Sequence, residues 1–199
     1  MAPRPPRRTG HWLAWLAALL LCTLLLASGH AVSTEPVDPE LRQRLIAATA
    51  QESGFADVHD AEVWLIDMSG RLARWMPDPL ERMALLRLVH REAVRVELPP
   101  EMVLAVIQVE SAFDRWAISV VGARGLMQIM PFWVDEIGRP DDNLFDLETN
   151  LRYGTTILRH YYDIERGDWF RALGRYNGSL GSPRYPRRVF TAYQGRWLP

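Results

Sequence analysis

The spacing of apolar residues constrains the fold of this chain more than any other feature of its sequence. From Leu41 onward, apolar positions recur at intervals of three and four residues, and no convincing segment alternates between apolar and polar residues. Such spacing is typical of amphipathic helices, whereas strict alternation indicates half-buried strands. The sequence therefore predicts an all-α fold. We expect helices over residues 61–68, 80–94, 100–111, 147–162, 169–177 and 186–193, and short helices that begin near 126 and 131. Asp146 is the expected N-cap of the helix that ends at residue 162.

One expected helix is apolar on nearly all of its sides. Pro99 and Pro100 stand at its start, where the missing amide hydrogen of proline costs no helical hydrogen bond. The segment that follows, Met-Val-Leu-Ala-Val-Ile-Gln-Val, carries a single polar residue before Glu110. A helix that is hydrophobic all round is typically buried. We therefore expect residues 100–111 to be buried within the domain.

Composition excludes several classes of protein. With 199 residues, 48% of them hydrophobic and 24% charged, the chain is long enough for one domain with a sizeable core and is not disordered as a whole. The net charge of −1 argues against a nucleic-acid partner. Its single cysteine excludes an intramolecular disulfide framework. Because His59, His90 and His160 lack the spacing of metal ligands, we expect neither a metal site nor a cofactor.

The beginning of the chain has the layout of a secretory signal peptide. Arg4, Arg7 and Arg8 precede an uncharged apolar run over residues 13–26, and small residues follow it. The run is shorter than the roughly 20 residues that a membrane-spanning helix needs. We expect a signal peptide over residues 1–31 and a periplasmic mature chain, with an uncleaved inner-membrane anchor as the alternative.

Glu110 is the first candidate for a chemical role. It ends a strongly apolar run, so its charge would be poorly solvated. Partial desolvation raises the pKa of a carboxyl group, as a general acid that works near neutral pH requires. The alternative is an ordinary glutamate at a helix end, with its carboxylate in water and an unperturbed pKa. Local context alone leaves both interpretations open.

The residues after Glu110 favour the chemical role. The segment from Glu110 to Pro131 closely resembles the signature of the lytic transglycosylases, and specifically the catalytic domain of the soluble lytic transglycosylases, which is related in fold to goose-type lysozyme. The family pattern is Glu-Ser, an aromatic residue, Ala-x-Ser, and then Gly-Ala-x-Gly-Leu-Met-Gln-x-Met-Pro. The matching residues are Glu110, Ser111, Phe113, Ala117, Ser119, Gly122, Ala123, Gly125, Leu126, Met127, Gln128, Met130 and Pro131.

Later parts of the chain extend the resemblance to residues 85–189. The matching blocks are residues 143–146, Asn150 with Gly154, residues 172–177, and, less specifically, Tyr185 with Val189. The family usually continues after the Tyr-Asn pair with Ala-Gly, where this chain has Gly178-Ser179, so the shape of that loop is open. The resemblance implies a lysozyme-like helical catalytic domain with a substrate groove over residues 81–199, preceded by an N-terminal helical extension over residues 32–80.

The resemblance also implies a reaction. A typical glycosidase uses two carboxylates, but this family uses one to cleave the β-1,4 bond between N-acetylmuramic acid and N-acetylglucosamine. Glu110 would protonate the glycosidic oxygen, and the substrate's own N-acetyl group would stabilise the cationic centre. Glu110 would then accept the proton of the muramyl C6 hydroxyl, which closes a 1,6-anhydro ring without consuming water.

Matched positions imply five substrate-binding residues, which are Ser119, Gln128, Met130, Tyr176 and Asn177. Ser119 and Gln128 would hydrogen-bond the sugar or its acetamido groups, and Met130 would line the cleft. Tyr176 would donate to Glu110 or to the substrate, and Asn177 would support that wall. Each has a purely structural alternative, such as loop hydrogen bonds for Ser119 and Gln128.

Two other functions stay open. A hydrolase of the same fold would need a positioned water and a second carboxylate, for which Asp114, Asp135 and Asp146 are the candidates. A non-catalytic peptidoglycan-binding protein would have no chemical need for Glu110. The expected partner is the glycan strand of peptidoglycan, and the sequence does not choose among the secretion, flagellar and division machineries of the envelope.

Overall fold

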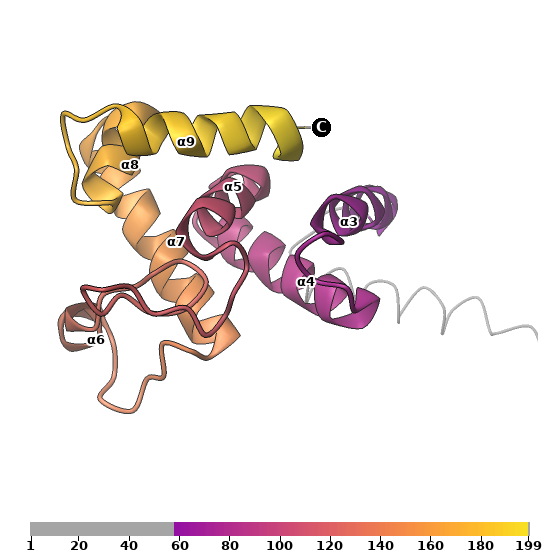
Figure 1. Cartoon of the computed structure of the whole chain (residues 1–199), viewed down its shortest axis with the longest axis horizontal. Helices are drawn as coiled ribbons and strands as arrows, with labels where there is room; N and C mark the ends of the chain where they lie inside the picture. Colours follow the sequence, from indigo (N-terminus) through magenta and orange to yellow (C-terminus); the bar gives the residue numbers. More distant parts are fainter. Residues whose placement is uncertain (1–57, 199) are drawn as a thin grey trace, which may run out of the picture. The chain divides into compact units, whose positions relative to one another are not determined.

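The structure, a computed structural model, describes residues 58–198 as helices joined by turns and loops (Figure 1). In chain order the elements are α3 (Val58–Leu72), α4 (Pro79–Arg95), α5 (Pro100–Ser111), α6 (Phe132–Ile137), α7 (Leu147–Ile164), α8 (Trp169–Tyr176), α9 (Arg184–Ala192) and the terminal π-helix η1 (Tyr193–Trp197). Extended pairing over residues 58–198 is limited to two isolated antiparallel bridges, which join Arg124 to Ile118 and to Ile129. The all-α prediction is confirmed for this part of the chain.

The expected signal peptide and most of the expected N-terminal extension lie outside the described residues, so the boundaries at residues 31 and 80 stay predictions. Helix α3, which falls within the expected extension, packs against α4. Its Leu65, Met68 and Leu72 belong to the same hydrophobic core as α5. No helix between residues 58 and 198 combines the length and the apolarity needed to cross a membrane.

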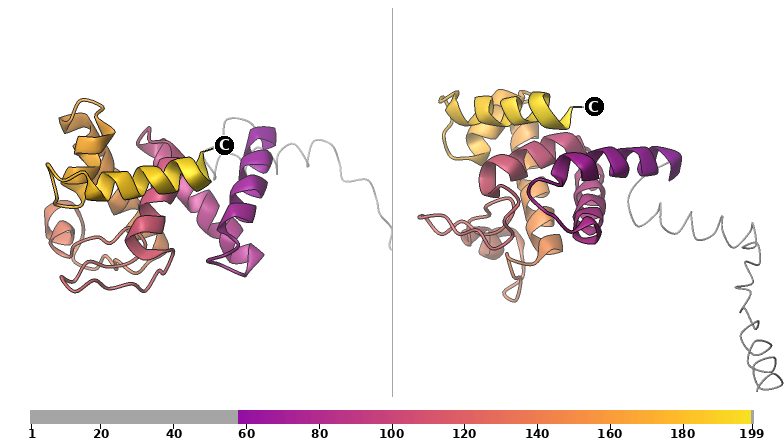
Figure 2. Two further views of the ribbon diagram at one scale, coloured as in Figure 1. Left: turned by 45° about the horizontal axis from the view of Figure 1, so that its top comes forward. Right: turned by 45° about the vertical axis from the view of Figure 1, so that its right-hand side comes forward.

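Helix α5 forms the centre of the core, as its uniformly apolar sequence predicts. Residues 102–107 are each at most 2% exposed. Helix α4 packs against one side of α5, and α9 with the π-helix η1 that continues it packs against another (Figures 1 and 2). Since the hydrophobic effect scales with the apolar area removed from water, this helix is the main anchor of the fold.

Aspartate side chains determine where three of the other helices begin. Asp78, Asp146 and Asp168 each accept a hydrogen bond from a backbone N–H in the first turn of α4, α7 and α8, respectively. These bonds satisfy amide groups that have no partner within the helix. The N-cap predicted at Asp146 is confirmed, with Thr149 N 2.9 Å from Asp146 Oδ1.

The end of α5 places Glu110 next to the loops. Ala112 and Phe113 have φ angles of 49° and 66°, in the left-handed region that a right-handed helix cannot include. The helix therefore stops at Ser111, and Glu110 lies in its last turn. Phe113 then turns inward to pack with Trp75 and Trp197, at ring-centroid distances of 5.2 Å and 5.6 Å.

The expectation of a helix beginning near residue 126 is wrong. Residues 124–129 form a tight turn, closed by two backbone hydrogen bonds of 2.9 Å between Arg124 and Ile129. Gly125 and Gln128 have φ angles of 74° and 50°, which exclude a right-handed helix. The buried side chain of Asn150 supports this turn from α7, because it accepts from Met127 N at 2.8 Å and donates to Arg124 O at 2.9 Å.

Candidate active site

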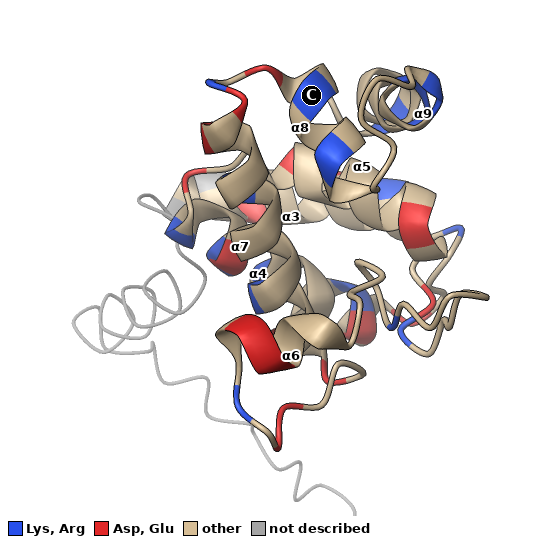
Figure 3. Cartoon of the chain, turned by 90° about the vertical axis from the view of Figure 1, so that its left-hand side faces the viewer, with Lys and Arg blue, Asp and Glu red and all other residues tan. Residues whose placement is uncertain are grey.

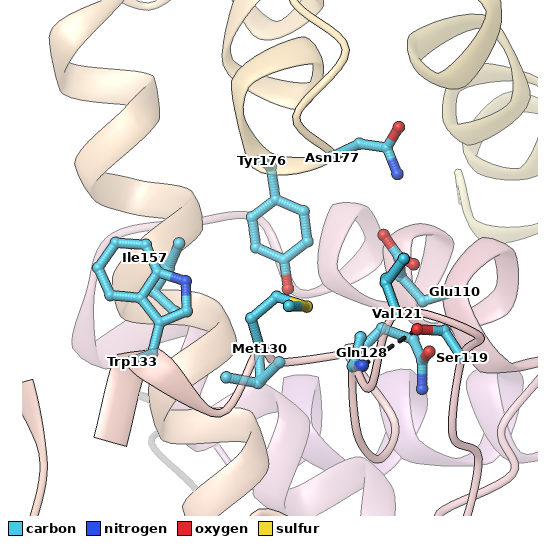
Figure 4. Close-up of a pocket in the computed structure, with 11 residues that line it drawn as sticks. Glu110, Ser119, Val121, Gln128, Met130, Trp133, Ile157, Tyr176 and Asn177 are labelled. Atoms are coloured by element: carbon cyan, nitrogen blue, oxygen red, sulfur yellow. Dashed lines mark hydrogen bonds between the residues drawn. The ribbon is translucent and has the colours of Figure 1, made fainter. Parts of the chain in front are cut away.

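A cavity of about 220 Å³ lies beside the end of α5 (Figure 4). The structure brings all six predicted site residues to its lining, namely Glu110, Ser119, Gln128, Met130, Tyr176 and Asn177. Sequence reasoning missed other lining residues, which are Val121, Ala123, Ile129, Trp133 and Ile157. These come from four separate parts of the chain, so only the folded structure shows that they are neighbours.

Glu110 is the acid of this cavity. Its Oε1 accepts a hydrogen bond of 2.5 Å from the hydroxyl of Tyr185, a buried residue of α9. Burial raises the pKa of Glu110 from 4.5 to about 7, and the Tyr185 hydrogen bond and the charge of Arg188 offset only part of that increase. The carboxyl group is therefore close to half protonated at neutral pH, so it can both donate and accept a proton there.

The structure corrects the expected partner of Glu110. The hydroxyl of Tyr176 donates to the backbone carbonyl of Met127 at 2.8 Å, so the prediction that it donates to Glu110 is wrong. Tyr185 makes that contact instead. Its signal in the sequence is the match of Tyr185 and Val189, four residues apart on the buried face of α9. A contact between Tyr176 and the substrate stays a prediction.

Ser119 and Gln128 line the cavity and also hold its loop together. The Ser119 hydroxyl accepts from Ala123 N at 3.0 Å. The amide nitrogen of Gln128 donates to the carbonyls of Ala117 and Gly125, at 3.1 Å and 3.0 Å. Both residues therefore form the loop hydrogen bonds that their structural alternative predicts. The hydroxyl hydrogen of Ser119 and the amide oxygen of Gln128 are not used in these bonds.

The cavity has apolar and polar walls. Trp133 lies on the side away from Glu110, and in the view of Figure 4 the Tyr176 ring and the Met130 side chain lie between Trp133 and the carboxylate. Asn177 caps the end of α8, and its Oδ1 accepts from Ser179 Oγ at 3.0 Å. A sugar ring has an apolar face and a polar rim, so a cavity with both kinds of wall is chemically suited to a saccharide.

The three candidates for a second carboxylate do not line this cavity. Asp114 accepts from Trp116 N at 2.9 Å within its own loop. Asp146 caps α7, and Asp135 is exposed on α6. Among the described residues that line the cavity, Glu110 is therefore the single acid.

Comparison with known proteins identifies relatives of this chain. Residues 87–192 match the family model described as the transglycosylase SLT domain. A membrane-bound lytic murein transglycosylase C of Yersinia pestis (strain Pestoides F) is 31% identical, over 54% of this chain and 35% of that relative. This chain therefore spans about a third of the length of that curated relative.

Two solved structures are also similar. An inactive variant of the lytic transglycosylase Slt from Pseudomonas aeruginosa is 31% identical, covering 49% of this chain and 17% of that protein, with a TM-score of 0.43. The 70 kDa soluble lytic transglycosylase of Escherichia coli is 27% identical, covering 74% of this chain and 25% of that protein, with a TM-score of 0.44. Because the family model matches more than half of its residues, this chain belongs to the transglycosylase SLT domain family.

Proposed function

We propose that this protein is a peptidoglycan lytic transglycosylase with Glu110 as its acid and base. The observation that carries the proposal is one partly buried carboxyl group, with a pKa of about 7, in a cavity whose described lining contains no other acid. A pKa near the working pH gives a group both of the protonation states that the reaction needs. The name of the Yersinia pestis relative, a lytic murein transglycosylase, supports the same activity.

In the proposed mechanism Glu110 first donates a proton and then accepts a different one. The protonated carboxyl group donates to the glycosidic oxygen as the bond from that oxygen to C1 of the muramyl residue breaks. The carbonyl oxygen of the substrate's N-acetyl group stabilises the positive charge at C1. Glu110, now a carboxylate, accepts the proton of the C6 hydroxyl while that oxygen bonds to C1. The products are a 1,6-anhydro-muramyl end and a free N-acetylglucosamine end, and no water is consumed.

Tyr185 would assist the first half of this cycle, in which Glu110 gives up its proton and the carboxylate forms. Its hydroxyl donates to Glu110, and such a bond stabilises the ionised carboxylate more than the neutral acid. Ser119 Oγ and Gln128 Oε1 are the groups that we assign to the hydroxyl and acetamido groups of the sugar. Met130 and Trp133 would pack against the apolar ring face.

Hydrolysis of the same bond is the alternative reaction. An inverting or retaining hydrolase typically places a second carboxylate opposite its acid. Asp114, Asp135 and Asp146 all lie outside the lining of the cavity, which supports the single-carboxylate reaction. For the location of the protein, we propose the periplasm, where murein lies, with export through residues 1–31.

Product analysis of purified sacculi tests the proposal. The native chain is expected to release muropeptides that end in anhydro-muramic acid, detected by mass spectrometry. Glu110→Gln should lower turnover by at least about a thousandfold, because loss of general acid and base catalysis together is large. Glu136→Gln, a matched change at an exposed glutamate of α6, should leave turnover unchanged. Reducing muramic acid ends would mean hydrolysis, and near-normal turnover by Glu110→Gln would refute the assignment of the acid.

A further inference from the structure

A second hollow, of about 490 Å³, is rich in arginine. Its lining includes Arg74, Arg187, Arg188 and Arg196 and contains neither aspartate nor glutamate. We call it the arginine hollow. Its concentrated positive charge contrasts with the net charge of −1 of the chain. Among its arginines, Arg188 acts on Glu110, because its charge lowers the pKa of that carboxyl group.

The sequence of α9 explains half of this charge. Arg184, Arg187 and Arg188 are spaced by three and four residues, so they share one face of the helix. Tyr185 and Val189 are on the opposite, buried face, which packs against α5 and α8. Helix α9 carries basic positions and no acidic one (Figure 3). One face of α9 therefore packs in the core, and the opposite face carries positive charge.

Within residues 58–198, the four arginines of the hollow form no ion pair with a carboxylate, unlike many other arginines there. Among residues 58–198, acidic side chains form ion pairs with Arg71, Arg91, Arg95, Arg152, Arg159, Arg171 and Arg175. No such pair within that range involves an arginine of the hollow. Positive charges gathered without compensation repel one another and attract anions.

An aromatic ring holds two of these charges in place. The guanidinium carbons of Arg74 and Arg196 lie 4.5 Å and 5.2 Å from the ring centroid of Trp75. Cation–π contact restricts both side chains although their charges are alike. A guanidinium that is already oriented loses less conformational entropy when it binds an anion.

A third hollow links the arginine hollow to the active site through shared lining residues. Arg188 also lines a neighbouring hollow of about 430 Å³, together with Tyr185 and Asn177. Asn177 in turn lines the cavity of Glu110. Shared lining residues therefore connect the acid to the arginines, so a ligand that occupies the active site and carries a side branch can reach both.

We propose that the arginine hollow binds the carboxylates of the peptide stems that murein carries on its muramyl residues, and that the protein therefore prefers stem-bearing over stripped glycan. The inference rests on the proposed function, because it assumes that the glycan occupies the cavity of Glu110. The muramyl residue whose C1 reacts at Glu110 is also the residue that bears a stem. Guanidinium groups pair with carboxylates through two parallel hydrogen bonds, which suits an acidic peptide.

The first experiment compares two substrates, intact strands and strands from which an amidase has removed the stems. The native chain is expected to release anhydro-muramyl products from intact strands at least about tenfold faster, since tenfold corresponds to one net charge-assisted hydrogen bond. The triple variant Arg74→Gln/Arg187→Gln/Arg196→Gln should lose this preference and keep its rate on stripped strands. Arg188 is left unchanged because its charge acts on Glu110.

A matched control removes the same charge elsewhere. The exposed residues Arg87, Arg139 and Arg166 lie outside the arginine hollow, so their triple change to Gln should keep the preference. The single variant Arg187→Gln guards against an effect on folding, because no described side chain forms an ion pair or hydrogen bond with Arg187. It is expected to lower the preference for intact strands about threefold. No preference in the native chain, or an unchanged preference in both variants of the hollow, would overturn the proposal.

A direct binding experiment tests this inference independently of the proposed function. The stem tetrapeptide alone, titrated into the Glu110→Gln chain by isothermal calorimetry, should bind, and its affinity should fall at least about tenfold in the triple hollow variant. If the native chain released no anhydro products from any strand, the proposed function would fail, and this titration would still decide the inference. Equal binding of inorganic phosphate at the same ionic strength would mean an unselective anion site and would contradict the proposal.

Discussion

At the scale of single residues, the chemistry depends on how Glu110 is surrounded. Burial raises its pKa to about 7, while the Tyr185 hydroxyl and the Arg188 charge limit the increase. A carboxyl group acts as an acid only in its protonated form, so kcat/KM is expected to fall as the pH rises through 7. The pH at which kcat/KM falls therefore depends on the surroundings of Glu110.

Tyr185→Phe should move this fall to higher pH. The change removes a hydrogen bond to the charged form of Glu110, so the pKa rises further, by about one unit for a bond of about 1.4 kcal/mol. The pH profile of kcat/KM measures the shift. Tyr176→Phe is the control, since its hydroxyl donates to the Met127 carbonyl, and its profile should stay in place. An unchanged profile for Tyr185→Phe would show that the hydroxyl does not act on the acid.

At the scale of elements, close approach between α7 and the turn over residues 124–129 shapes the cavity. A Cβ atom at Gly154 would lie 2.3 Å from the sulfur of Met127 and 2.8 Å from its Cβ. Both distances are much shorter than a van der Waals contact distance. Only glycine at this position of α7 lets the turn pack so closely, and the same turn carries Gln128 into the cavity.

Gly154→Ala should therefore destabilise the protein, although alanine ordinarily favours a helix. Overpacking costs typically about 1–3 kcal/mol, which exceeds the gain in helix propensity of about 1 kcal/mol. Urea unfolding would measure the loss. Gly70→Ala in α3 is the matched control, because nothing lies within 4 Å of its added Cβ. That variant should gain up to about 1 kcal/mol. Equal effects at both glycines would contradict the packing argument.

At the scale of the whole described molecule, the end of the chain closes the core. Trp197 is fully buried, stacks on Trp75 at a centroid distance of 5.9 Å, and donates from Nε1 to Gln108 Oε1 at 2.8 Å. Arg71 of α3 donates to the carbonyls of Arg196 and Leu198. Helices α3 and α5 thus share contacts with the C-terminal π-helix, so distant parts of the sequence stabilise one another.

Trp197→Ala should lower the free energy of unfolding by about 3–5 kcal/mol, which is a large share of the typical 5–15 kcal/mol. The change leaves a cavity and deprives Gln108 of its partner. Trp197→Phe keeps a ring and should cost less. Urea denaturation compares the three chains. A loss below about 1 kcal/mol in the alanine variant would show that η1 is not part of the cooperative unit.

Local sequence determined much of this protein. The three-and-four spacing of apolar residues is enough to predict helices, and the uniformly apolar residues 102–107 are enough to predict a buried α5. Asp146 could be recognised as an N-cap because capping depends on residues only three positions apart. The motif over residues 110–131 and the later block over residues 172–177 were enough to name six of the residues that line the cavity.

Tertiary structure alone decided the partners of these residues. Tyr185 and not Tyr176 donates to Glu110, because the packing of α9 on α5 brings together side chains that are 75 positions apart. The turn over residues 124–129 is not helical, since Asn150 of α7 provides hydrogen bonds that local propensity does not include. The raised pKa of Glu110 also depends on the tertiary structure. Desolvation depends on every element that surrounds the carboxyl group, whereas helix period and capping depend only on near neighbours in the chain.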